Sequence, residues 1–299
     1  MRKLLLIFAL MISVASSAFA TVAVIDGINY LLYPDNGEAI VTYKKDYSGD
    51  IVIPNTVKYN NTDYSVTSIQ YNAFQDCSGL TSITIPKSVT YIEVGELGIA
   101  PFYGCSNLTT IIVEEGNPKY DSRNNCNAII ETSSNTLIVG CKNTTIPNSV
   151  TSLYAAFCGC RNLNSIEIPN SVTAIGGGAF ADCSGLESIT IPNSVTTIGK
   201  FVFWGCSSLK HITIPNSVTT IGENAFRECN SLLSIKLSTS LTSIEESSFY
   251  NCNNLLSITI PNSVISIGGW AFHGCKSLTS ITIPNSVKSI GQGAFEGCI

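Results

Sequence analysis

Apolar and polar residues follow one another in a fixed order that repeats every 23 residues along most of the chain. The unit is clearest over residues 186–206, where two apolar runs flank the turn sequence Pro192-Asn193-Ser194. Its apolar positions are Leu186, Ile189, Ile191, Val195, Ile198, Val202, Phe203 and Cys206. Proline ends a strand because it cannot donate to a continuing ladder, so each unit is predicted to hold two short extended segments. One coil cannot bury these side chains alone, whereas stacked coils share a continuous core.

The regularity of the repeat is carried by three residue types. Phenylalanine keeps the 23-residue step at Phe157, Phe180, Phe203, Phe226, Phe249, Phe272 and Phe295. Proline follows the first apolar run at Pro169, Pro192, Pro215, Pro261 and Pro284, with Ser238 at the position where one is missing. Cysteine closes each unit at Cys160, Cys183, Cys206, Cys229, Cys252, Cys275 and Cys298. A fixed period of this length predicts a solenoid.

The repeated pattern L-x-x-I-x-I-P-x-x-V-x-x-I-G-x-x-A-F-x-x-C resembles the BspA-like leucine-rich repeats of bacterial surface proteins. Two copies are LESITIPNSVTTIGKFVFWGC (186–206) and LTSITIPNSVKSIGQGAFEGC (278–298). The resemblance covers residues 67–299 and implies a mainly β leucine-rich-repeat solenoid with a concave parallel sheet. It also implies surface adhesion or protein binding. The sequence departs from the common leucine-rich pattern because it has no asparagine ladder and Val195 comes one residue early.

Departures from the period predict the domain organisation. Residues 21–66 precede the repeats and contain three short strand-like runs, which we interpret as a small N-terminal β cap on the solenoid of residues 67–299. A separate ligand-binding module is the alternative. Residues 114–145 form an insertion, in which the apolar runs 128–130 and 137–139 flank a polar turn and predict a hairpin.

The first twenty residues are typical of an export signal. Arg2 and Lys3 precede an apolar run over residues 4–14, and Ala18-Phe19-Ala20 fits a cleavage site. An uncleaved membrane anchor is the alternative. No second long apolar run follows, so we expect no transmembrane segment after cleavage. The predicted location is outside the cytoplasm, as a secreted, periplasmic or cell-surface protein.

The net charge and the histidine content argue against two classes of function, nucleic-acid binding and catalysis. The chain has 16 basic and 21 acidic residues, a net charge of −5, and this argues against nucleic acid as a partner. The two histidines, His211 and His273, occupy different repeat positions, and no nucleophile–base pair is visible. We therefore expect no catalytic residues, no metal ligands, no cofactor and no enzymatic activity.

Cysteine spacing predicts free thiols and not disulfides. The nine cysteines of one repeat position, here called the cysteine ladder, are Cys77, Cys105, Cys160, Cys183, Cys206, Cys229, Cys252, Cys275 and Cys298. Neighbouring coils lie ~4.8 Å apart, at or beyond the Cβ separation of about 3.5–4.5 Å that a disulfide needs. Cys126, Cys141 and Cys158 lie outside the ladder, and a Cys126–Cys141 bridge across the hairpin is an open alternative. The spacing of Cys158 and Cys160 is too short for a zinc site.

The outward residues of the first extended segment form the predicted binding surface, here called the strand face. They are Ser165, Glu167, Ser188, Thr190, His211, Thr213, Ser234, Lys236, Ser257, Thr259, Ser280 and Thr282. This surface is rich in hydroxyl groups and is interrupted by Glu167, His211 and Lys236. The ligand is expected to be a protein or a glycan of unknown identity. The alternatives are a hydroxyl-rich sheet that is merely solvated, and a repeat domain that serves as a spacer or docking arm in a larger assembly.

The last repeat has no covering segment in the sequence. Its apolar residues are Ile281, Ile283, Val287, Ile290 and Phe295. Uncovered apolar faces and strand edges favour pairing with another chain. The expectation is either an incomplete reading frame or self-association through the C-terminal coil.

Overall fold

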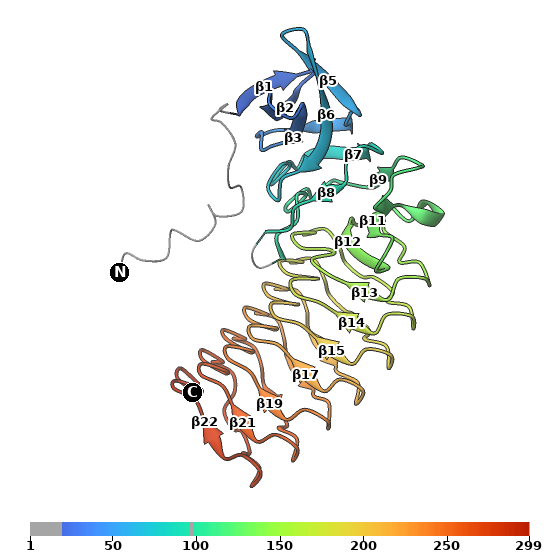
Figure 1. Ribbon diagram of the computed structural model, residues 1–299. Coiled ribbons are helices and arrows are strands. Elements are labelled where there is room, and N and C mark those ends of the chain that lie inside the picture. The colour runs from blue at the N-terminus through green and yellow to red at the C-terminus, as the bar shows by residue number, and fades with distance from the viewer. Residues whose placement is uncertain (1–19, 96–97, 299) are drawn as a thin grey trace.

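A computed structural model describes residues 20–95 and 98–298, so the predicted signal peptide lies outside the described residues. A twisted sheet forms the N-terminal end, and coils stack from it toward the C-terminus (Figure 1). Each coil contributes short strands that pair in parallel with the equivalent residues of the next coil, as in Thr197 with Thr220. The predicted mainly β leucine-rich-repeat solenoid is therefore confirmed.

The N-terminal sheet combines antiparallel and parallel pairs. Its strands, in spatial order, are β1 (Thr21–Ile25), β2 (Ile28–Tyr33), β3 (Glu38–Val41), β6 (Thr62–Ile69) and β5 (Thr56–Tyr59), with β8 (Tyr91–Ile92) also paired to β6. The β6–β8 pair is parallel, which joins this sheet to the first coils. The N-terminal β cap over residues 21–66 stays a proposal. Strand β6, which begins within this range, already pairs with β8 of the solenoid.

The first extended segment of the coils forms one side of the solenoid. Its parallel strands are β4 (Ser48–Val52), β7 (Gly79–Ile85) and β9 (Thr110–Val113), and further on β16 (His211–Thr213), β18 (Ser234–Lys236) and β20 (Ser257–Ile258). Between these two groups, residues 165–168 and 188–191 pass through the same position without forming a regular strand. The sheet on this side is therefore divided.

The second extended segment forms parallel strand pairs in two separate sheets. Its strands are β13 (Ser152–Leu153), β14 (Ala174–Ile175), β15 (Thr197–Ile198) and β17 (Thr220–Ile221), followed by β19 (Ser243–Ile244), β21 (Ser266–Ile267) and β22 (Ser289–Ile290). Glycine follows five of these seven strands, as at Gly199 and Gly222, where an added Cβ would lie 2.8 and 2.5 Å from the preceding coil.

The insertion belongs to the first of these two sheets. It holds β10 (Tyr120–Asp121), the short 3-10 helix η2 (Arg123–Asn125), β11 (Ala128–Glu131) and β12 (Thr136–Gly140). Strands β11 and β12 pair antiparallel, with Ile129 opposite Val139. Strand β12 then pairs in parallel with β13, with Thr136 opposite Ser152. The hairpin is thus the first member of the sheet that continues through the coils.

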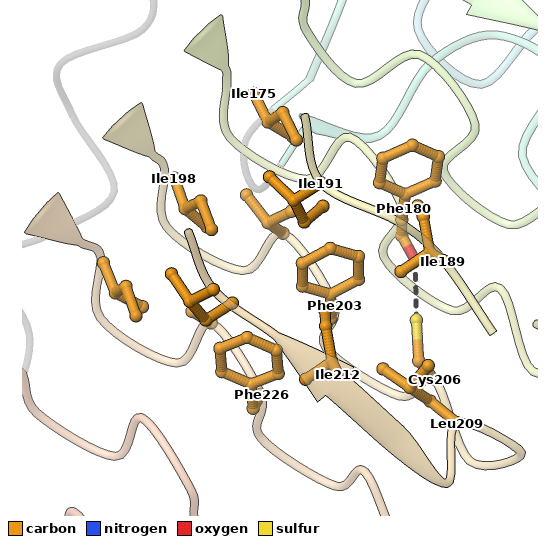
Figure 2. Packing of buried hydrophobic residues seen from close by; sticks show 14 of the residues in the cluster. Ile175, Phe180, Ile189, Ile191, Ile198, Phe203, Cys206, Leu209, Ile212 and Phe226 are labelled. Carbon is orange, nitrogen blue, oxygen red and sulfur yellow. Dashed lines mark hydrogen bonds between the residues drawn. The ribbon is translucent and has the colours of Figure 1, made fainter. Parts of the chain in front are cut away.

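Buried phenylalanine rings stack along the centre of the coils (Figure 2). Consecutive rings from Phe157 to Phe295 have centroids 5.2–5.6 Å apart and nearly parallel planes. Where proline is missing, the buried hydroxyl of Ser238 donates to the carbonyl of Val218 at 2.6 Å, so the polar substitute is satisfied inside the core.

The core is divided into two clusters that meet at the insertion. One extends from Cys126 to Ala294 and the other from Ala23 to Ala155. Polar side chains join the coils on either side of this boundary. The Tyr103 hydroxyl donates to Asp182 at 2.8 Å, and the Arg161 guanidinium lies 3.0 Å from Asp182 and 3.5 Å from Asp76. We call these four side chains the junction cluster.

The last described coil is less covered than the others. Ile281, Ile283, Val287 and Phe295 are only partly buried, and Ile290 is 50% exposed. Their equivalents in the preceding coil, such as Ile260, Val264 and Phe272, are buried. Within the described residues, no helix has the length and apolar character needed to cross a membrane.

Candidate functional site

The strand face lies on the outside of the first extended segment. All but one of its predicted residues are exposed, and Ser234 is half-buried. The alternating neighbours Ile189, Ile212 and Ile235 are buried, because successive side chains of an extended segment point to opposite sides. Whether this surface binds a ligand stays a prediction.

Three adjoining hollows follow the strand face over successive coils. The first, of about 560 Å³, lies between the insertion and Glu167; the second, of about 690 Å³, runs from Ser165 to Asn193. The third, of about 550 Å³, extends to Lys236. Ser165 and Glu167 line both the first and the second hollow, and Thr190 lines both the second and the third. Together they form one shallow trough, here called the strand-face trough.

One edge of the trough carries a row of asparagines that the sequence analysis did not select. These residues follow the repeated proline and are exposed at Asn148, Asn170, Asn193, Asn216, Asn262 and Asn285. Four of them, from Asn148 to Asn216, line the hollows. An amide side chain can both donate and accept, so this row adds hydrogen-bonding capacity beside the hydroxyl groups. The repeated Pro-Asn pair was the signal that could have revealed it.

A second feature that sequence analysis missed is a contact between His211 and Ser234. The imidazole Nδ1 lies 2.9 Å from the serine Oγ, because residues 23 positions apart occupy neighbouring coils. Both side chains reach solvent, and within the described chain no carboxylate hydrogen-bonds to His211. In catalytic nucleophile–base pairs a third group orients the base.

His273 lies elsewhere, on the turn that follows Phe272. Its ring stacks on Tyr250 with centroids 4.7 Å apart, and its Nδ1 lies 3.7 Å from a carboxylate oxygen of Glu296. Among the described residues, no group of three or more histidine, cysteine or carboxylate side chains is arranged to hold a metal ion.

The cysteine thiols are poorly reactive. All twelve are free, including Cys126 and Cys141, so the alternative bridge across the hairpin is not formed. Burial raises the pKa of Cys126 to about 11 and that of Cys158 to about 12. A thiol is nucleophilic only as the thiolate, and these thiols stay protonated at neutral pH. Within the ladder, Cys160 and Cys298 are partly exposed and the others are buried.

The fold defines the class of this protein as a leucine-rich-repeat solenoid with a hollowed polar face. A model of the BspA type leucine rich repeat region, in six copies, matches residues 53–131, 129–256 and 242–299. The chain belongs to this family. A search among curated proteins found no match.

Three solved structures show related chains. A leucine-rich repeat protein from Eubacterium ventriosum is 26% identical with a TM-score of 0.57, over 83% of this chain and 64% of that one. A leucine rich cell surface protein from Faecalibacterium prausnitzii is 25% identical, with a TM-score of 0.39, over 93% of this chain and 92% of that one. A leucine-rich repeat protein from Bacteroides ovatus is 27% identical, with a TM-score of 0.38, over 93% and 92%. The chain thus spans less than two thirds of the Eubacterium protein.

Proposed function

We propose that this protein is an exported, non-enzymatic binding protein that recognises another protein through the strand-face trough. The observation that carries the proposal is the continuity of the three hollows along the predicted strand face. Stacked coils give such solenoids extended binding surfaces, and membership of a repeat family typical of surface proteins supports the same function. Export rests on the signal pattern of residues 1–20.

The chemistry of the trough favours a polar, weakly charged partner surface. Its charged groups, Glu167 and Lys236, have opposite signs, and the remaining outward side chains are mainly hydroxyls and amides. Two opposite charges produce a weak electrostatic field, so the trough attracts a partner only weakly over long distances. Recognition therefore depends on many hydrogen bonds formed at close range by these side chains.

An array of host-matrix proteins and glycans tests this proposal. Purified protein lacking residues 1–20 is compared with a triple variant in which Glu167, His211 and Lys236 are changed to serine. We expect capture by one or more proteins and at least a tenfold loss in the variant. A glycan captured through the same residues would favour the alternative of a glycan-binding trough. Equal capture by both forms would exclude the trough.

Self-association through the C-terminal coil is a second proposal, supported by the partly exposed Ile281, Val287 and Ile290. Light scattering over a range of concentrations measures it. Replacing Ile290 by Lys should lower the average mass if these side chains pair between copies. An unchanged mass would mean that another surface, or none, mediates association.

A further inference from the structure

A further hollow, separate from the strand-face trough, lies where the insertion interrupts the coils. Its volume is about 440 Å³, and strands β8, β10, β11, β12 and β13 supply its lining. Tyr91 and Tyr154 line it, and their exposed fractions are 54% and 44%. Ile92 and Ile138 form a buried apolar floor. We call this site the tyrosine hollow; none of its residues belongs to the strand face.

Both exposed tyrosines depart from the repeat. Tyr91 pairs with Ser68, and the equivalent position of the following sheet holds small side chains: Thr136, Ser152, Ala174, Thr197 and Thr220. A bulky ring at this position adds nothing to the core, which lies on the opposite side of the strand. Exposed aromatic side chains on an otherwise polar sheet are therefore candidates for ligand contact.

Tyr154 occupies a position that is glycine in five other coils and Glu245 in one. At the equivalent Gly199 and Gly222, an added Cβ would lie 2.8 and 2.5 Å from backbone nitrogens of the preceding coil. Tyr154 is the first residue of this position after the insertion and carries a full side chain. One edge of its ring lies against Gly176, whose added Cβ would be 3.0 Å from the tyrosine Cδ2. The absence of a side chain at Gly176 leaves room for the ring, which is therefore positioned by the next coil.

Charged groups of both signs line the hollow. The ammonium of Lys119 is 3.9 Å from a carboxylate oxygen of Glu131, and both side chains remain partly exposed. Ser134 donates to the other oxygen of Glu131 at 2.7 Å, which holds the carboxylate in place. Thr136 and Ser152 add hydroxyl groups to the lining. The hollow thus offers donors and acceptors but no net charge.

We propose that the tyrosine hollow binds a neutral saccharide. The C–H groups of a pyranose carry partial positive charge and pack on the negative face of an aromatic ring, as Tyr91 and Tyr154 provide. Each sugar hydroxyl both donates and accepts, so it pairs with the Glu131 carboxylate as well as with the Lys119 ammonium. Aromatic walls with a few fixed polar groups are the usual composition of a small-ligand site.

A proline-rich peptide is the competing ligand, because such segments also dock in aromatic grooves. Proline has no backbone N–H, so a proline-rich segment leaves the exposed carboxylate oxygen of Glu131 without a donor. An acidic saccharide would gain from Lys119 but be repelled by Glu131, only 3.9 Å away. The balanced pair therefore favours a neutral sugar.

Binding to an array of neutral and acidic oligosaccharides of plant, microbial and animal origin tests this proposal, with a decaproline peptide as the competing probe. The best hexasaccharide is then titrated by calorimetry. We expect the double variant Tyr91→Ala/Tyr154→Ala to bind at least tenfold more weakly, with an unchanged melting temperature. Tyr43→Ala is the matched control, since Tyr43 is 43% exposed and lies outside the hollow. Glu131→Gln should also weaken binding.

Three results would overturn the proposal: no neutral oligosaccharide binds, binding survives the double variant, or decaproline or acidic sugars are preferred. The triple strand-face variant separates this site from the proposed function. It should keep full saccharide affinity, because its substitutions lie on the strand face, outside the hollow. A strand-face trough that fails its own test therefore leaves this inference standing.

Discussion

The thiol of Cys206 donates a hydrogen bond to the carbonyl oxygen of Phe180, 3.1 Å away in the preceding coil (Figure 2). The same bond joins Cys183 to Phe157, and it repeats to the end of the stack at 3.0–3.3 Å. One repeated residue therefore satisfies a backbone carbonyl at every step while filling the core. The carbonyl of Phe180 also accepts the backbone N–H of Cys183 at 3.2 Å, so alanine at position 206 would remove one of its two hydrogen bonds.

Stability should fall at high pH because the folded thiols resist ionisation. Burial raises the pKa of Cys275 from its ordinary 9.0 to about 12. The unfolded state therefore releases its protons first, and the contribution of Cys275 to stability is intact below pH 9 and lost between pH 9 and 12. Its slope approaches about 1.4 kcal/mol per pH unit. Urea titrations at several pH values measure the loss, and Cys275→Ala should show a shallower one; a flat profile to pH 11 would contradict the burial.

Replacing Phe226 by alanine should cost about 3–5 kcal/mol, the range for buried phenylalanine truncations. The ring is fully buried, with centroids 5.2 Å from Phe203 and 5.5 Å from Phe249. Denaturant unfolding gives the value. Phe201→Ala is the control, because Phe201 is half-buried and should cost about 1 kcal/mol or less. Equal losses at the two sites would contradict the assignment of Phe226 to the centre of the core.

Deleting one whole period should leave a folded protein. Removal of residues 191–213 brings equivalent positions together, since Thr197 already pairs with Thr220 in the same geometry. Stability in such arrays is roughly a sum of unit and neighbour terms. Removing eleven residues from the same place instead shifts every later coil out of register and should unfold it. Circular dichroism and thermal melting compare the two, and similar melting curves would be inconsistent with the solenoid.

The junction cluster should couple the two cores. Tyr103→Phe combined with Arg161→Ala removes the hydrogen bond and both ion pairs to Asp182 and Asp76. We expect a loss of about 1–2 kcal/mol and separation of one calorimetric transition into two. Lys200→Ala, which breaks an exposed pair with Glu223, should change stability by less than about 0.5 kcal/mol. A single sharp transition in the double variant would mean that apolar contacts alone join the cores.

Most of the solenoid follows from the sequence because each apolar position is decided by stacking. All eight apolar positions of residues 186–206 are buried. In the N-terminal part, the three expected runs, residues 28–33, 39–43 and 50–53, correspond to β2, β3 and β4, but β1, β5 and β6 were missed. The outward residues Val22 and Val24 of β1 are apolar yet exposed, so its pattern lacks polar alternation, and β5 is too short and polar to stand out.

Contacts between irregular segments could not be predicted. The tyrosine hollow depends on how the insertion packs between β8 and β13, and no period relates Tyr91 to Tyr154. The His211–Ser234 contact, in contrast, follows from the 23-residue offset and was accessible to the same reasoning that found the cysteine ladder. Contacts between stacked coils recur in every repeat, so one copy predicts the next. The contacts at the junction occur once, and no second copy in the sequence reveals them.

During folding, stacking of the coils competes with oxidation of the ladder cysteines. An unstacked thiol has its ordinary pKa of 9.0 and is open to oxidation, whereas a stacked one is buried and bonded to the coil before it. In an oxidising compartment the chain must finish stacking before its thiols pair with the wrong neighbours. A mispaired bridge would hold two coils at a separation that the repeat does not allow. The yield of active protein is then governed by the rate of folding, more than by the stability that the finished stack attains.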